Sequence, residues 1–475
     1  MSAPDLIALL PLLIVAATTL AAMLLIAFYR HHQATAGVTV AGLLLALASL
    51  SLTTPHIPRV VTPLLVVDGY ALFFLGLVLA TTAVVTALSY RYLEPAAENV
   101  EEYYLLLLMG ALGGGVLISA RHFVSFFLGL ELLSVSLYTL VAYTRSQSHR
   151  IEAGLKYLIL AGTASAFLLF GLALVYAEQG HLVFEDVVLS DPSLFLLSGM
   201  GLLIVGVAFK LALAPFHLWT PDVYQGAPAP VTAFVATVSK GAVFALLFRF
   251  FGGVRIAEQP ALLAAFGAIA ILSMLAGNLL ALVQDNVKRI LAYSSIAHLG
   301  YLTIAFLVGG ELGQTAAAFY LAIYFVTTLT AFGVVTWLST AEEEAEALDD
   351  YRGLFRRSPH LAGIFTVALL SLAGIPPTAG LISKVYVALA GVSVSLWAPL
   401  LVLVAGSVAG VFYYMRIVIT MWRDPAGDEQ AVSFSAGHAP AGYLILNGLT
   451  LALLALGVYP FFLIQIIERA LGAGG

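Results

Sequence analysis

Four of the five lysines in this chain of 475 residues lie inside long apolar stretches, where a permanent charge is costly. They are Lys156, Lys210, Lys240 and Lys384, whereas almost all of the fifteen arginines lie between such stretches or at their ends. Arginine keeps its proton at any physiological pH, but lysine releases its proton readily when it is removed from water. Lysines in these positions therefore indicate groups that take up and release protons in an apolar environment.

One carboxylate and one histidine lie equally deep: Glu131 in "FFLGLELLSVSLY" and His298 in "AYSSIAHLGYL". A charge at the centre of a bilayer costs at least about 2.5–3.5 kcal/mol, so such groups are expected to face protein, water or a counter-charge. Structural interpretations stay open for three of the residues. Glu131 could be a structural partner of one lysine, Lys156 could reach the interface from barely a turn inside its stretch, and His298 could be a neutral core residue. Lys240 and Lys384 lie more than a turn from any stretch end, so an interfacial position suits them less well.

The apolar stretches that must position these groups are long enough to cross a lipid bilayer. Hydrophobic residues make up 61% of the chain and charged residues only 10%, whereas a soluble domain has about a quarter charged residues. A membrane-spanning helix needs roughly 20 apolar residues, while barrel strands would alternate over segments of about ten. We therefore predict an all-α integral membrane protein, a single membrane domain over 1–475, with about 14 transmembrane helices. The predicted spans are 5–28, 38–55, 68–90, 102–120, 122–143, 152–177, 194–218, 228–251, 258–283, 288–308, 314–339, 361–390, 395–422 and 440–463.

Prolines interrupt two of the predicted spans next to a lysine. In 194–218, Pro215 removes a backbone donor close to Lys210, and in 361–390 the segment "GIPPTAGLISK" breaks the helix before Lys384. An interrupted helix at membrane depth is tolerated only where it is buried in protein or lines a cavity. Broken helices paired with ionisable residues are typical of transporters. We predict that the seventh and twelfth helices are broken.

The spans also form two units of five helices each, 102–251 and 258–422. In each unit the second span carries Glu131 or His298, and the fourth span is broken and carries a lysine. Because five is odd, consecutive units must have opposite orientations in the membrane, which predicts an inverted repeat. The second unit has no counterpart to Lys240.

The loop charges predict the orientation of the chain. Ten arginines and lysines, Arg150 and Lys288 among them, fall in the odd-numbered loops, and four fall on the other side. The positive-inside rule then places the odd loops in the cytoplasm and both termini on the outer side. The acidic segment "AEEEAEALDD" at 341–350 is interpreted as a solvated loop between spans.

The residue content also limits the cofactors that this chain can carry. It has no cysteine, which excludes disulfides and cysteine-ligated iron–sulfur clusters. It has no GxGxxG motif after a strand and no P-loop, so it shows no nucleotide site of its own. We expect no cofactor, no metal and no nucleic-acid partner on this chain.

Three long motifs resemble a known family: "KLALAPFHLWTPDVYQGAPAPVTAFVATVSK" (210–240), "DNVKRILAYSSIAHLGYL" (285–302) and "LSLAGIPPTAGLISKVYV" (370–387). They are similar to subunit N of the proton-pumping NADH:quinone oxidoreductases, the respiratory complex I family. The resemblance runs over nearly the whole chain, and the form "TPDVYQGAPAPV" resembles subunit N rather than its paralogues L and M.

The resemblance implies that the chain translocates protons, coupled to quinone reduction elsewhere in the complex, in a bacterial inner membrane. It implies partners as well: other membrane and peripheral subunits, including the paralogous antiporter-like subunits, with flavin and iron–sulfur clusters on the partners. It also implies a role for each ionisable residue. Glu131 matches the glutamate that partners a lysine, Lys210 the central proton carrier, Lys156 and Lys240 further lysines of the hydrophilic axis, His298 the tenth-helix histidine, and Lys384 the lysine near the outer exit.

Two other functions stay open at this point. The chain could be a subunit of a related multisubunit cation/proton antiporter or membrane-bound hydrogenase, because these share the antiporter-like fold. It could also be a structural scaffold that moves no ions, but a scaffold gives no reason to keep several ionisable residues in the apolar interior. The neighbouring genes would separate an oxidoreductase from an antiporter.

Overall fold

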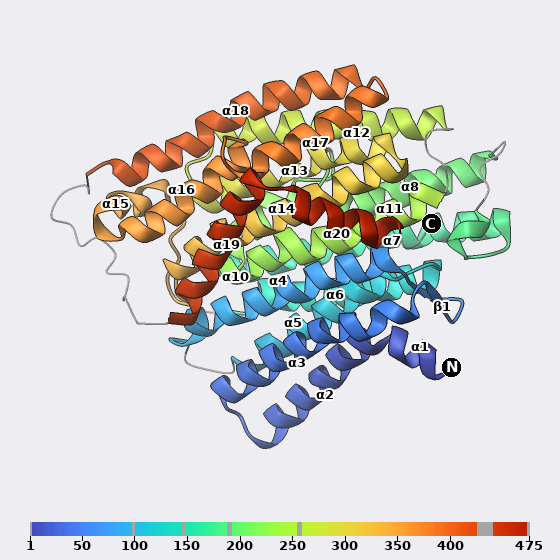
Figure 1. Cartoon of the computed structure of the whole chain (residues 1–475), viewed down its shortest axis with the longest axis horizontal. Helices are drawn as coiled ribbons and strands as arrows, with labels where there is room; N and C mark the ends of the chain where they lie inside the picture. The colour runs from blue at the N-terminus through green and yellow to red at the C-terminus, as the bar shows by residue number, and fades with distance from the viewer. Residues whose placement is uncertain are drawn as a thin grey trace.

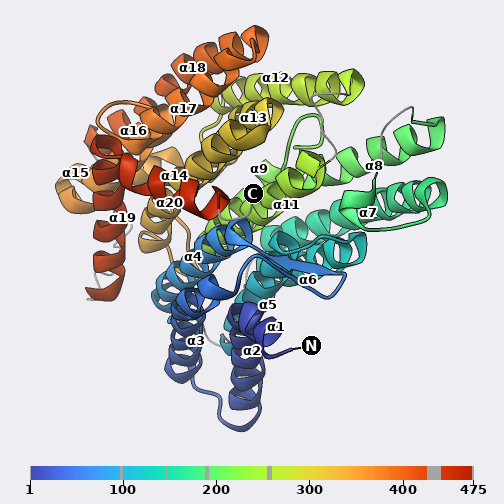
Figure 2. The ribbon, with the colours of Figure 1, turned by 45° about the vertical axis from the view of Figure 1, so that its right-hand side comes forward.

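The computed structural model describes residues 2–96, 100–144, 148–187, 192–253, 259–424 and 440–472. Long helices packed side by side dominate these residues (Figures 1 and 2). The helices are α1 (Ala3–Ala8), α2 (Leu10–Phe28), α3 (His32–Thr53), α4 (Gly69–Leu93), α5 (Glu101–Ile118), α6 (Phe123–Val141), α7 (Ser148–Gln179), α8 (Leu194–Lys210), α9 (Trp219–Gly226), α10 (Ala229–Phe234), α11 (Lys240–Gly253), α12 (Pro260–Leu282), α13 (Val287–Val308), α14 (Gly310–Trp337), α15 (Leu354–Arg357), α16 (Pro359–Ala373), α17 (Ala379–Ser393), α18 (Trp397–Trp422), α19 (Pro440–Val458) and α20 (Phe461–Gly472).

Twelve helices in the described part of the chain are long and apolar enough to cross a membrane. Each of them corresponds to one predicted span; one runs continuously from α10 through a π-helical segment, η3 (Val235–Ser239), into α11. The remaining two predicted spans, 194–218 and 361–390, hold interrupted helices. The prediction of an all-α membrane protein is therefore confirmed.

Both predicted interruptions are present. The first broken span divides into α8, which ends at Lys210, and α9, which begins at Trp219. The second divides into α16 and α17, and Gly374 ends α16 in the left-handed region with φ +80°. Such a left-handed cap suits glycine, and the prolines that follow cannot continue the helix.

The most deeply buried helices form the centre of the bundle. Within an apolar stretch of 18 residues in each helix, every residue of the α10–α11 span is buried, as are 94% of those in α13 and in α14, but only 33% in α2 and 17% in α19. The outer helices therefore present their apolar side chains to lipid or to partner subunits. The central three helices are the ones that carry Lys240, His298 and several tyrosines.

Glycines allow close contact between the first two helices of each predicted five-helix unit. A Cβ at Gly113 of α5 would lie 2.6 Å from the backbone nitrogen of Leu133 in α6, and a Cβ at Gly277 of α12 would lie 2.5 Å from that of Ala297 in α13. In each pair, the two helices thus approach each other backbone to backbone.

The connecting segments gather at the two ends of the bundle. At one end, strands β1 (Arg59–Val61) and β2 (Leu65–Val67) form an antiparallel hairpin in the register Arg59↔Val67, Val60↔Val66 and Val61↔Leu65. This hairpin bridges to the turn after α5, from Leu65 to Ala120. At the other end, Asn286 in the turn after α12 forms an antiparallel β-bridge with Ala347 in the acidic segment 341–350. Helix α20 packs against α14 and α4 and, in Figure 1, ends on the side of the molecule that also holds the N-terminus. Neither the hairpin nor α20 was part of the sequence prediction.

Candidate functional site

Lys210 is the last residue of α8, so its side chain is placed by the break in that span. It is 4% exposed. Its Nζ donates a hydrogen bond of 2.6 Å to Ser134 Oγ on α6 and lies 5.8 Å from the ring centre of Tyr138. A cation at the C-terminal end of a helix is also favoured by the helix dipole. The interruption therefore gives the lysine both a hydroxyl partner and a favourable field.

Glu131 lies on α6 one turn before Ser134, so the two residues share a helix face. One carboxylate oxygen, Oε1, accepts a hydrogen bond of 2.6 Å from Ser165 Oγ on α7. The described residues include no ion pair between Glu131 and Lys210; the lysine binds the hydroxyl of Ser134 instead. The structure brings the two groups to one region of the bundle, and the direct pairing stays a prediction.

Lys240 begins α11 immediately after the π-helical segment η3 and is completely buried. Its Nζ donates a hydrogen bond of 2.7 Å to Ser295 Oγ on α13, and Ser295 in turn lies 2.6 Å from the hydroxyl of Tyr324 on α14. The Tyr224 hydroxyl is 3.4 Å from the same serine, and its ring centre is 5.1 Å from Nζ. A π-helical turn re-aims the residues next to it and is frequent at functional sites.

His298 follows Ser295 on α13 by one turn and is 6% exposed. Its Nδ1 lies 2.7 Å from the hydroxyl of Tyr320 on α14, and its Nε2 lies 3.4 Å from the hydroxyl of Tyr414 on α18. Tyr414 also shares a hydrogen bond with Ser294. The histidine is therefore held between two phenols, in agreement with a hydrogen-bonded core residue and with a proton carrier alike.

Lys384 on α17 is bound by the broken end of α16. Its Nζ donates to the carbonyl oxygens of Leu372 at 2.9 Å and Ala373 at 3.0 Å, and it lies 5.3 Å from the ring centre of Tyr301. The last carbonyls of a helix have no partner within that helix, so the break supplies the acceptors that a buried ammonium group needs. The two interruptions thus favour a lysine charge in different ways: the end of α8 acts on Lys210 through the helix dipole, whereas the end of α16 supplies the carbonyl acceptors of Lys384.

Lys156 lies apart from the other predicted site residues. Its side chain is 46% exposed and pairs with Glu152 at 2.9 Å and with Asp222 at 3.1 Å. These contacts are typical of a lysine that reaches the surface of the bundle, which is the interfacial interpretation given above. A role for Lys156 in the relay stays a prediction.

The interpretation of the acidic segment 341–350 as a solvated loop is wrong for one residue, Glu344. Two cations counted in the odd-numbered loops are also buried: Arg150 is 1% exposed and Lys288 completely buried. Glu344, from the acidic segment 341–350, is 3% exposed, pairs with Lys288 and lies 3.9 Å from Arg150. Buried charged groups need partners, and Glu344, Arg150 and Lys288 provide partners for one another at this end of the bundle. No pattern in the sequence distinguishes Glu344 from its acidic neighbours. Two other residues of the charge count, Arg145 and Arg255, lie outside the described residues.

Sequence reasoning also missed the hydroxyl groups that connect the ionisable residues. Tyr224, Tyr324, Tyr320 and Tyr414 each lie within hydrogen-bond distance of a residue of the α13 segment 294–298. A signal for them exists in "YSSIAHLGY", where hydroxyl and imidazole side chains recur at the three- and four-residue spacing of one helix face. The partners come from α9, α14 and α18, far away in the sequence.

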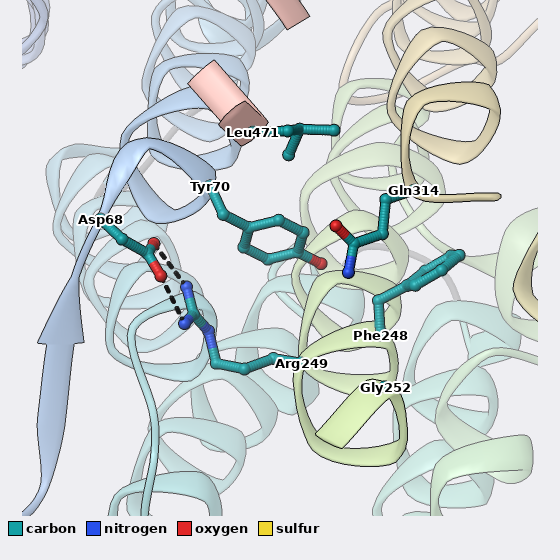
Figure 3. A pocket seen from close by; sticks show the side chains of 7 residues that line it. All are labelled: Asp68, Tyr70, Phe248, Arg249, Gly252, Gln314 and Leu471. Carbon is teal, nitrogen blue, oxygen red and sulfur yellow. Dashed lines mark hydrogen bonds and ion pairs between the residues drawn. The ribbon is translucent and has the colours of Figure 1, made fainter. Parts of the chain in front are cut away.

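A second polar site lies at the opposite end of the bundle from Glu344. Arg249, in the last turns of α11, donates two hydrogen bonds of 2.8 Å to Asp68 before α4 and one of 3.0 Å to the carbonyl of Ile118. Burial opposes ionisation of Asp68, but its hydrogen bonds with Arg249 hold the carboxyl pKa below its ordinary value. Figure 3 shows this ion pair beside a pocket of about 190 Å³ that Tyr70 and Gln314 also line. Because both charges are fully engaged with each other, the pair connects elements and offers no open charge to a ligand.

The described residues contain no group of three or more histidine, aspartate or glutamate side chains that could hold a metal ion. Within them, the polar axis consists of lysine, histidine and hydroxyl groups. Such groups exchange protons by hydrogen bonding.

Comparison with known proteins extends over almost the whole chain. Residues 120–412 match the family described as NADH:quinone oxidoreductase/Mrp antiporter, TM. The chain is 47% identical to NADH-quinone oxidoreductase subunit N of Ectopseudomonas mendocina (strain ymp), over 99% of this chain and 97% of that protein. It is 49% identical to the subunit N of Nitrosospira multiformis, over 99% of this chain and 96% of that protein.

Solved structures have the same fold. A chain of respiratory complex I from Thermus thermophilus with bound aureothin matches with a TM-score of 0.84 and 36% identity, over 98% of this chain and 100% of that chain. A chain of the Mrp complex from Dietzia sp. DQ12-45-1b matches with a TM-score of 0.85 over 99% of this chain and 97% of that chain, and its 22% identity indicates a shared fold only. The chain therefore belongs to the NADH:quinone oxidoreductase/Mrp antiporter family and, within that family, to NADH-quinone oxidoreductase subunit N.

Proposed function

We propose that this chain carries protons across the membrane as a subunit of an NADH:quinone oxidoreductase, along the buried axis of Lys210, Lys240, His298 and Lys384. Quinone is reduced elsewhere in the complex, by flavin and iron–sulfur clusters on partner subunits. The chain itself supplies no redox group. Glu131 acts as the counter-charge to Lys210, and Lys156 connects the axis to the membrane interface.

The observation that carries this proposal is the lack of carboxylate partners, among the described residues, at the three lysines of the axis. Among the described residues, Lys210, Lys240 and Lys384 take part in no ion pair; their Nζ atoms donate to hydroxyl or carbonyl oxygens. The buried cations Arg150 and Lys288, in contrast, each pair with a carboxylate. Burying an unpaired charge is costly, and a group so placed neutralises readily. A scaffold would pair these lysines or replace them, whereas a proton carrier needs them to alternate between the charged and neutral forms.

The hydroxyl groups next to the lysines suit proton transfer between them. A hydroxyl donates one hydrogen bond and accepts others, so Ser295 receives a proton from Lys240 on one side and passes a proton to Tyr324 on the other. An electrostatic interaction with a nearby charge can control the protonation of these lysines. Two unit charges 4 Å apart interact by about 4 kcal/mol at an effective dielectric constant of 20. Bringing a counter-charge to a lysine, or removing it, is therefore large enough to change its protonation.

We also propose that 102–251 and 258–422 are inverted repeats. The support lies in the matched features of the two units: a glycine-mediated contact between the first two helices and a broken fourth helix with its lysine. Two half-units of opposite orientation would open toward opposite sides of the membrane. The chain would lie in a bacterial inner membrane with both termini on the outer side, as the excess of positive charge in the odd loops indicates.

The experiment that tests the function measures proton pumping by the assembled complex in membrane vesicles. Lys240→Arg keeps the positive charge but holds its proton, so proton pumping should fall at least about ten-fold. NADH oxidation with an artificial electron acceptor and the amount of this subunit in the purified complex report assembly. Arg30→Lys, which changes an exposed ion pair with Glu102, is the matched control and should pump normally. Wild-type pumping by Lys240→Arg would contradict the proposal.

A further inference from the structure

A buried ionic cluster lies at the end of the bundle that holds the 338–347 segment, and the proposed axis does not include it. At its centre is Glu344, whose carboxylate binds Lys288 Nζ and the hydroxyl of Tyr92 and lies 3.9 Å from Arg150. Lys288 and Arg150 come from α13 and α7, which belong to different five-helix units. Glu346, which is 22% exposed, lies 3.9 Å from Lys288 on the side of the surface. The cluster thus joins both units to a connecting segment.

The pair of Lys288 and Glu344 closes the junction between α9 and α10. Lys288 Nζ donates to the carbonyl oxygens of Gln225 at 2.9 Å and Ala227 at 2.6 Å, at the C-terminal end of α9. Glu344 accepts a hydrogen bond of 2.9 Å from the backbone N–H of Ala229, the first residue of α10. A cation at a helix C-terminus and an anion at a helix N-terminus are both favoured by the helix dipoles. The pair therefore caps the helix that leads to Lys240.

Polar contacts connect this buried pair to the surface. Glu346 accepts a hydrogen bond of 3.4 Å from the side-chain amide of Gln225. The amide oxygen of Gln225 accepts one of 3.1 Å from Arg289, which also binds Asp222 at 2.8 Å. Asp222 is 39% exposed and is the partner of the surface residue Lys156. An unbroken series of hydrogen-bonded polar groups thus runs from the surface to Glu346, beside Lys288.

Helix α13 connects the pair to the interior. Lys288, Ser295 and His298 follow one another at seven and three residues, which places them on one helix face, with Lys288 and Ser295 about 10 Å apart along the axis. Ser295 is the hydroxyl that Lys240 binds. Tyr224, in α9 next to the Gln225 carbonyl that Lys288 binds, reaches toward the same serine. Both routes from the cluster thus lead to the Lys240–Ser295 contact.

We propose that Lys288, held against Glu344, is a further proton carrier that loads the buried axis from this end of the bundle; the inference rests on the proposed function. The charges of the cluster permit the step. When an Nζ–H bond of Lys288 breaks, water takes up the proton and carries it to the hydroxyl of Ser295, and Lys288 becomes neutral. Arg150 keeps its charge beside Glu344, so the deeply buried carboxylate is never left without a cation. Glu346, which is 22% exposed and lies 3.9 Å from Lys288, takes up a proton at the surface and passes it to Lys288, which restores the ammonium group. Lys288 can therefore release its proton because Arg150, the other cation beside Glu344, stays charged.

The test measures proton pumping and its pH dependence in vesicles of the assembled complex with Lys288→Arg. Arginine keeps the positive charge and can donate to Glu344 and to the α9 carbonyls, but it does not release a proton. Pumping should fall at least ten-fold, with the subunit content and NADH oxidation with an artificial acceptor unchanged. If Lys288 only holds the helices together, Lys288→Arg pumps at the wild-type rate, which would overturn the inference.

A second variant serves if the larger guanidinium prevents assembly. Glu344→Gln keeps a side-chain oxygen that can accept hydrogen bonds from Tyr92 and the Ala229 N–H, but it no longer favours the charged form of Lys288. The dependence of pumping on pH should then change, because the nearest anion to Lys288 is removed. An unchanged pH profile would contradict the inference. Lys240→Arg, measured in parallel, separates the two proposals: if it pumps normally the proposed function itself fails, and if it does not while Lys288→Arg pumps normally, only the role of Lys288 fails.

Discussion

At the scale of single residues, the chain uses its two kinds of cation differently. Arg150 and Arg249 are bound to carboxylates or lie close to them, so their charges are permanent parts of the fold. Lys210, Lys240 and Lys384 bind neutral oxygens. A neutral oxygen stabilises a charged lysine less than a carboxylate does and leaves the neutral form within reach. Proton exchange by these lysines stays a prediction from the sequence, and their neutral partners support it.

Replacing Ser295 by alanine should lower proton pumping strongly and stability moderately. The change removes the hydroxyl that accepts from Lys240 and lies against Tyr324, and a buried donor left without its partner costs about 1–3 kcal/mol. Thr303→Ala is the matched control on the same helix, because Thr303 is equally buried and binds only the Leu299 carbonyl of its own helix. Proton pumping and thermal unfolding of the purified complex measure both effects. Equal pumping by the two variants would exclude Ser295 from the path.

At the scale of elements, the contact between α12 and α13 depends on Gly277. A Cβ there would meet backbone atoms of Ala297 and Tyr293 at 2.5 and 2.6 Å, so Gly277→Ala should destabilise the subunit by about 1–3 kcal/mol. Gly267, in the same helix α12, has no atom within 4 Å of an added Cβ. Gly267→Ala should therefore be neutral or stabilising by up to about 1 kcal/mol. The midpoint of thermal unfolding of the assembled complex compares the two variants, and an equal response would show that the close approach is not needed.

Sequence analysis predicted the elements that are determined by the residues of the segment itself. Twelve apolar runs and the two breaks at Lys210 and Gly374 follow from hydropathy and from proline and glycine, which act on the backbone where they stand. The hairpin of β1 and β2 was missed because two strands of three residues leave almost no pattern. The π-helical turn before Lys240 was missed too, since it depends on tertiary packing. Glu344 was assigned to solvent because its partners lie about fifty to two hundred and fifty residues away in the chain.

At the scale of the whole molecule, the burial of its helices separates a central axis from a surface that faces lipid or partners. The α10–α11 span, α13 and α14 are almost completely buried and carry the polar groups, while the outer helices carry exposed apolar side chains. The polar axis runs from Lys210 through Lys240 and His298 to Lys384 without an exposed lysine between them. If the proposed function holds, proton paths from the two sides of the membrane meet this axis within the protein.

The two ends of the bundle should label from opposite sides of the membrane. Glu185, with a side chain 67% exposed, and Asp349, 78% exposed, lie at opposite ends. Because the chain has no cysteine, Glu185→Cys and Asp349→Cys each provide a single thiol. A membrane-impermeant maleimide should label Glu185→Cys in intact cells whose outer membrane has been opened, and Asp349→Cys only in inverted vesicles. Labelling of both from one side would contradict the proposed topology.

The most direct test of the account is proton pumping by the assembled complex with Lys210→Arg and Lys210→Ala. Lys210 ends α8 at the first break and binds Ser134 without a carboxylate partner in the described part of the chain. If this lysine works by exchanging its proton, arginine should be nearly as damaging as alanine, because the guanidinium holds its proton at physiological pH. Both variants should then pump at no more than about a tenth of the wild-type rate, at normal subunit content. Wild-type pumping by Lys210→Arg would show that the residue is a fixed charge and would contradict the proton-relay account.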